Sequence, residues 1–67
     1  MKADLQFIAD FVRIAKMRII EIEERLIEID QDLARSESAT LRSYKVISIE
    51  TLNLNKRIVE NYERFIK

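Results

Sequence analysis

The sequence contains no glycine, proline, cysteine, histidine or tryptophan. Glycine and proline supply most tight turns, and the short hairpins of a β-sheet need residues that accept positive φ. An α-helix needs neither property. The composition therefore predicts an all-α protein, and 67 residues are enough for one small domain.

The missing residue types also remove most catalytic and metal-binding chemistry. Without cysteine there is no disulfide and no thiolate, which suits a reducing compartment. Without histidine the Glu-x-x-His motif of di-metal bundles is impossible, and without glycine there is no phosphate-binding loop. Glu24 and Glu28 share a helical face, but a solvated acidic face explains them better than an acid–base pair does. We expect no enzyme, no metal and no cofactor.

Long apolar runs and a charge excess are absent as well. No segment approaches the roughly 20 apolar residues that cross a bilayer, and the N-terminus lacks the pattern of a signal peptide. Twelve basic residues balance twelve acidic ones, whereas nucleic-acid binders usually carry a basic excess. The charge is divided, however: residues 1–37 hold six basic and nine acidic residues, and residues 38–67 hold six and three.

The first half of the chain carries an uninterrupted apolar repeat with steps of three and four residues. This repeat predicts a helix from about residue 4 to 34, with Asp4 at its start. Its apolar side should pack along another helix. The repeat, called the first-helix ladder below, consists of Leu5, Ile8, Val12, Ala15, Ile19, Ile22, Leu26, Ile29 and Leu33.

The second half predicts a helix from about residue 39 to 66. Its expected seam is a similar ladder made of Tyr44, Ile47, Thr51, Leu54, Ile58, Asn61 and Phe65. A flanking stripe adds Leu41, Leu52, Val59, Tyr62 and Ile66. Three small polar residues, Ser48, Thr51 and Asn55, interrupt the apolar face, and they either fix the register of the interface or lie at its rim.

Residues 35–38 separate the two predicted helices with a short polar segment. Ser36 or Ser38 can cap the second helix. A single continuous helix of about 100 Å is the alternative. An antiparallel hairpin is favoured by the central position of the break, by the similar lengths of the helices, and by the charge division. Folding back should place the acidic end of the first helix near the basic start of the second, a group made of Glu28, Asp30, Asp32, Arg42 and Lys45.

Apolar residues also lie on both sides of the first-helix ladder. Phe7, Phe11 and Ile14 form a stripe on one side, and Ile20 and Ile27 lie on the other. One returning helix cannot cover both sides. A partner should therefore complete a bundle with the hairpin, through a second copy or a different protein, and these five residues are the predicted partner-binding residues.

Three short segments resemble a known family. Asp32-Leu33-Ala34-Arg35 at the end of the first helix, Tyr44 early in the second, and the Ile58, Val59 and Tyr62 group are similar to the small helical-hairpin co-chaperones of type III secretion needle subunits. The resemblance implies that the chain pairs with a larger, tetratricopeptide-like helical chaperone in the bacterial cytoplasm. Together the pair would keep the needle subunit soluble before export.

Two other functions are compatible with the pattern. A homodimeric four-helix bundle that regulates RNA would need a basic helix face, for which Lys2, Arg13, Lys16 and Arg18 are the candidates. A structural coiled-coil assembly module would need only the ladders.

Overall fold

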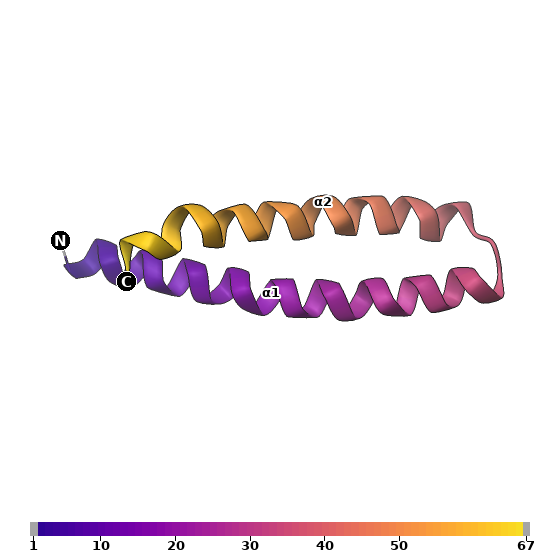
Figure 1. The fold of residues 1–67 in the computed structure, drawn as a ribbon, viewed down its shortest axis with the longest axis horizontal. Helices are drawn as coiled ribbons and strands as arrows, with labels where there is room; N and C mark the ends of the chain where they lie inside the picture. Colours follow the sequence, from indigo (N-terminus) through magenta and orange to yellow (C-terminus); the bar gives the residue numbers. More distant parts are fainter. Residues whose placement is uncertain (1, 67) are drawn as a thin grey trace.

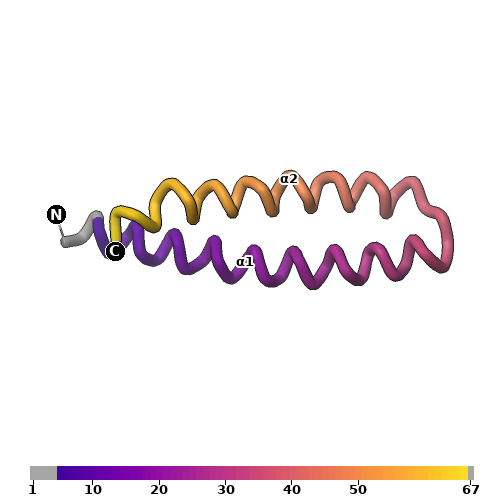
Figure 2. The backbone as a smooth tube through the Cα atoms, in the orientation of Figure 1, coloured from indigo at the N-terminus to yellow at the C-terminus, as the bar shows by residue number. Residues whose placement is uncertain are grey.

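The computed structural model describes the backbone of residues 2–66 and the side chains of residues 5–66. It is an antiparallel helical hairpin with α1 at Lys2–Arg35, α2 at Ala39–Tyr62 and a short 3-10 helix, η1, at Glu63–Phe65 (Figure 1). The described residues contain no strand. The two helices run side by side along the whole hairpin, which measures 52 × 15 × 15 Å (Figure 2). The predicted all-α hairpin is confirmed, and the single continuous helix is excluded.

The end of the second helix differs from the sequence prediction. The α-helix stops at Tyr62, four residues before the expected end, and the chain tightens into η1. The last carbonyls of an α-helix have no intrahelical partner, and a final 3-10 turn satisfies some of them. Here the Ile66 amide donates to the Glu63 carbonyl oxygen at 3.1 Å. At the start of α1, Asp4 was predicted to place its carboxylate at the positive end of the helix dipole. Its side chain lies outside the described ones.

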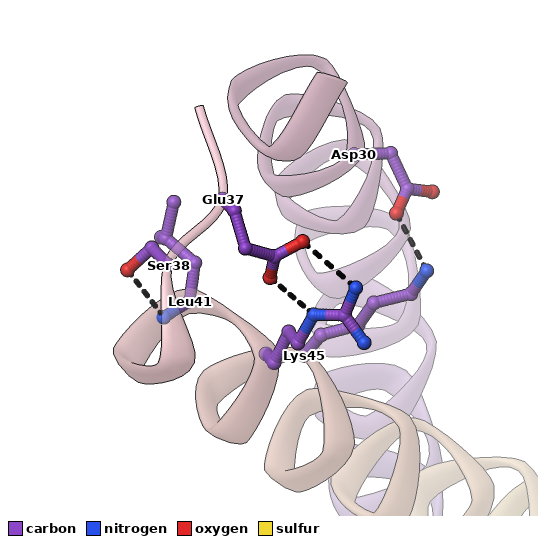
Figure 3. A network of polar contacts seen from close by, with 6 residues as sticks. Asp30, Glu37, Ser38, Leu41 and Lys45 are labelled. Carbon is purple, nitrogen blue, oxygen red and sulfur yellow. Dashed lines mark hydrogen bonds and ion pairs between the residues drawn. The ribbon is translucent and has the colours of Figure 1, made fainter. Parts of the chain in front are cut away.

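The connection between the helices works without glycine because Ser38 caps α2 from an extended conformation. Its φ and ψ are −147° and 120°, and its hydroxyl oxygen accepts from the Leu41 amide at 3.2 Å. The Ser36 amide closes α1 by donating to the Asp32 carbonyl oxygen at 3.0 Å. No described residue has a positive φ. Of the two predicted capping residues, Ser38 makes the bond (Figure 3).

The core follows the first-helix ladder, which lies on α1, as the sequence predicts. Val12, Ala15, Ile22 and Ile29 are buried, whereas Leu5, nearest the open end of the hairpin, is 48% exposed. The buried set is small, so the hairpin has a narrow seam with little apolar depth. Such a seam leaves a short chain marginally stable on its own.

The second helix meets this seam with a different stripe from the one predicted. Ser48, Leu52 and Asn55 are its buried residues. We call the stripe that faces α1 the inner stripe, and it contains Leu41, Lys45, Ser48, Leu52, Asn55, Val59 and Tyr62. The predicted ladder lies outside it, with Tyr44, Ile47, Leu54 and Phe65 all exposed. That part of the sequence prediction is wrong, and we call the displaced ladder the outer stripe.

Ion pairs agree with this rotation of α2. Lys45 Nζ reaches Asp30 Oδ1 across the hairpin at 2.7 Å, one of the pairings expected from the divided charge. Arg42 turns instead to Glu37 in the connection and binds both oxygens of that carboxylate (Figure 3). Of the three small polar residues, Ser48 and Asn55 are buried in the seam, whereas Thr51 is half-buried on the outer stripe.

Candidate protein-interaction surface

Four aromatic side chains gather near the open end of the hairpin. The Phe7 and Phe11 rings stack at 6.4 Å between centroids, Phe11 meets Tyr62 edge-on at 5.9 Å, and Tyr62 lies 6.3 Å from Phe65. The cluster joins the first turns of α1 to the last turn of α2 and to η1. It is open to solvent, since Phe7 is 71% exposed and Phe65 is 53% exposed.

An apolar groove continues from this cluster along the hairpin. Its walls include Phe11 and Ile14 from α1 with Leu54 and Ile58 from α2. A second hollow continues toward the connection and shares Ile14, Arg18 and Thr51 with the first. We call the whole surface the aromatic face: it consists of Phe7, Phe11, Ile14, Tyr62 and the outer stripe of α2.

The two sides of the aromatic face differ in charge. The outer stripe carries no charged residue at any of its seven positions, from Tyr44 to Phe65. The hydroxyl of Thr51 makes its hydrogen bond within α2, since it donates to the Ile47 carbonyl oxygen at 2.9 Å. The α1 side is apolar only as far as Ile14.

Beyond Ile14 the α1 side of the face alternates in sign through Arg18, Glu21, Arg25 and Glu28. Arg25 places its guanidinium carbon 5.9 Å from the Tyr44 ring centroid. An apolar stripe with charged residues beside it is the usual surface of a helix that packs against another helix.

The opposite face of the hairpin is crossed by ion pairs. Ile20 and Ile27 are 58% and 59% exposed there. Lys16 and Glu63 join α1 to η1 at 2.7 Å, and Asp30 and Lys45 join α1 to α2. The structure thus gathers Phe7, Phe11 and Ile14 on one face and leaves Ile20 and Ile27 on the other. All five predicted partner-binding residues are exposed.

The sequence left open which stripe of α2 meets a partner. Tyr44, Ile47 and Leu54 were expected to face α1, and the structure instead leaves them exposed. A usable signal was present, because α2 carries two apolar stripes and α1 can cover only one of them. The absence of charge from the outer stripe marks it as the stripe that is suited to a further helix.

The basic residues proposed for RNA binding do not form one face. Arg13 lies 3.7 Å from Asp10, Lys16 pairs with Glu63, and Arg18 lines the aromatic face. The Lys2 side chain lies outside the described ones. This distribution does not favour the RNA-binding alternative.

The remaining polar chemistry is confined to the connection. The Arg42 guanidinium hydrogen-bonds the Glu37 carboxylate and so lowers the pKa of Glu37, while the same contact raises the pKa of Arg42. Among the described residues no three or more acidic side chains are grouped as metal ligands, and no helix has the length and apolar content needed to cross a membrane. The aromatic face is therefore the strongest candidate for a functional surface.

Comparison with known proteins assigns no family to the chain. No protein-family model matches the sequence, and searches of the curated proteins and of the solved structures find no significant match.

Proposed function

We propose that this protein is a helical protein-interaction module that completes a bundle with other helices docked on its aromatic face. The observation that carries the proposal is the uncharged outer stripe of α2, which continues into the aromatic cluster. Exposed apolar patches of this kind usually mark interaction sites, and an amphipathic helix laid in an apolar groove is a common mode of recognition.

The inner seam supports the same proposal. Asn55 is 6% exposed and Ser48 is 7% exposed, so the centre of the contact between α1 and α2 is partly polar. The Asn55 amide nitrogen donates to the Thr51 carbonyl oxygen at 2.8 Å, which satisfies the group within its own helix but adds no contact to α1. A hairpin whose inner stripe is more polar than its outer stripe gains stability when other helices cover the outer one.

We further propose a specific role, based on the resemblance to the co-chaperones of type III secretion needle subunits. In that role the aromatic face packs against a larger, tetratricopeptide-like chaperone in the bacterial cytoplasm, and Phe7, Phe11 and Ile14 contact it directly. Ile20 and Ile27 on the opposite face provide a second contact. The complex keeps the needle subunit soluble before export.

The test is recovery of partners from the source cell by an affinity-tagged chain, with identification by mass spectrometry. Phe7→Asp combined with Leu54→Asp places two charges on the aromatic face at positions that are 71% and 56% exposed in the hairpin alone. Gln31→Asp combined with Asn53→Asp adds the same charge at exposed polar positions away from this face and is the matched control.

We expect the wild type and the control to recover the same helical partner, and the Phe7→Asp/Leu54→Asp variant to lose it while retaining its circular dichroism at 222 nm. Equal recovery by all three chains would overturn the interaction surface. If a partner is recovered through the aromatic face but neither a helical chaperone nor a needle subunit is among the proteins, the co-chaperone role is wrong and the interaction module remains.

A further inference from the structure

We infer that a second copy of this chain covers the aromatic face when no other partner is bound. The two hairpins pack face to face and antiparallel, with α2 against α2 and α1 against α1 across one two-fold axis. This inference rests on the proposed function, because it names an occupant for the same surface.

The outer stripe of α2 is complementary to itself in this arrangement. With the axis level with Leu54 and Asn55, Leu54 lies beside Leu54 of the second copy. The antiparallel register then places Thr51 opposite Ile58 of that copy, and Tyr44 comes near the end of α2 of that copy, where the chain continues into η1. Because no position of the stripe is charged, no like charges are brought together.

The contacts between the helices fix the level of the same axis on α1. Phe11 meets Tyr62, Lys16 meets Glu63 and Asp30 meets Lys45 within one hairpin. Interpolation between the Phe11–Tyr62 and Asp30–Lys45 pairs, which lie on either side of this level, places Leu54 and Asn55 level with Ile19 and Ile20.

A two-fold axis at this level brings opposite charges together on α1. Arg18 lies beside Glu21 of the second copy, and Glu21 lies beside Arg18 of that copy. One axis therefore matches the apolar stripe of α2 and pairs Arg18 with Glu21 on α1, while Arg25 and Glu28 come level with Ile14 and Phe11 of the second copy. It also places the aromatic cluster of one hairpin near the Arg25–Tyr44 contact of the other, where the guanidinium favours aromatic neighbours.

The other two-fold arrangement of the same faces is less favourable. An axis parallel to the helices would lay α1 of one copy over the outer stripe of the other. Neither Arg18 nor Glu21 would then meet an opposite charge of the second copy, whereas the antiparallel arrangement pairs them twice. The charge pattern therefore selects the antiparallel dimer.

The size of the face and the charge of the chain suit such a dimer. The outer stripe is about 33 Å long and two helices together are about 20 Å wide, so the face has an area of roughly 660 Å². Each partner contributes roughly 800 Å² to a specific interface, which is a comparable area. The formal net charge is zero, so two copies approach without mutual repulsion.

The oligomeric state and its register can be tested on the purified full chain. Sedimentation equilibrium should show a dimer. Arg18→Glu alone and Glu21→Arg alone should each weaken it about tenfold, since each replaces two attractions by repulsions. The double variant Arg18→Glu/Glu21→Arg should recover wild-type affinity, because both pairs form again with their signs exchanged.

Disulfide formation provides an independent measure, because the chain has no cysteine of its own. Leu54→Cys should form a covalent dimer under mild oxidation, since position 54 lies on the axis. Asn53→Cys, one residue away and on another side of α2, is the matched control and should remain largely uncrosslinked.

A monomer at 100 µM, a double charge variant no better than its single parents, or equal crosslinking at positions 53 and 54 would each overturn the antiparallel dimer. A monomer that still recovers a helical partner from the source cell through the aromatic face would contradict the dimer and leave the proposed function standing. A dimer with the expected register that recovers no other protein would support the inference and contradict the co-chaperone role.

Discussion

Leu52 and Leu54 are two residues apart on α2 and belong to different stripes, so one substitution made at each position tests the rotation of the helix. Leu52 is 9% exposed against α1, and Leu54 is 56% exposed on the aromatic face. Leu52→Ala removes a buried side chain and leaves a cavity, which should cost about 2–3 kcal/mol of unfolding free energy. Leu54→Ala loses less than half of the roughly 1.5–3 kcal/mol that full burial of a leucine contributes, so about 1 kcal/mol or less is expected.

These losses are large for a chain of this length, whose total stability should be on the order of 5 kcal/mol. Urea unfolding followed at 222 nm measures both, at the lowest protein concentration that gives a signal. The cost of Leu54→Ala should then increase with protein concentration, because the second copy buries this residue, while that of Leu52→Ala should change much less. Equal losses at low concentration, or a greater loss for Leu54→Ala, would show that the outer stripe faces α1 and would refute the assignment of the two stripes.

The connection between the helices gives two further predictions. Ser38→Ala removes the acceptor for the α2 amides and should lower the free energy of unfolding in urea by about 1 kcal/mol. The Ser36 hydroxyl caps no helix, so Ser36→Ala should lower it little. Equal losses of unfolding free energy would exclude the cap. Because Arg42 lowers the pKa of Glu37 in the folded chain, this group stabilises the fold above the ordinary glutamate pKa of about 4.3, and the contribution disappears as the pH falls through the lowered value. Acid unfolding of Glu37→Gln should lack this part of the pH dependence, and an unchanged pH profile would rule out the Arg42 contact as its source.

The sequence predicted α1 and the connection correctly because several independent patterns favoured the same arrangement. The first-helix ladder has no competing stripe of equal length, and four of its residues, Val12, Ala15, Ile22 and Ile29, are buried. The polar segment before Ala39 contained a good capping residue, and the charge division favoured a chain that folds back over one continuous helix. Local chemistry and the overall fold therefore agreed.

The rotation of α2 could not be read in the same way, because apolar content favoured the wrong stripe. The inner stripe contains Lys45, Ser48 and Asn55, and a pattern that ranks stripes by hydrophobicity places it second. Its rotation toward α1 agrees with the Asp30–Lys45 ion pair, which joins the inner stripe to α1 at 2.7 Å. For the same reason, the sequence alone could not show which stripe of α2 meets a partner.

The short connection also determines the order in which the hairpin closes. Contacts beside it join residues that are close in the sequence, and the loop that each further pair must close grows steadily toward the open end, so the entropy lost on closure grows as well. Helix pairing should therefore start at the Ser38 cap and proceed toward the termini. The contact between Phe11 and Tyr62 joins residues 51 positions apart, so it forms among the last and opens among the first. The aromatic cluster holds the open end of the hairpin together, so a partner that binds there also keeps the two helices paired.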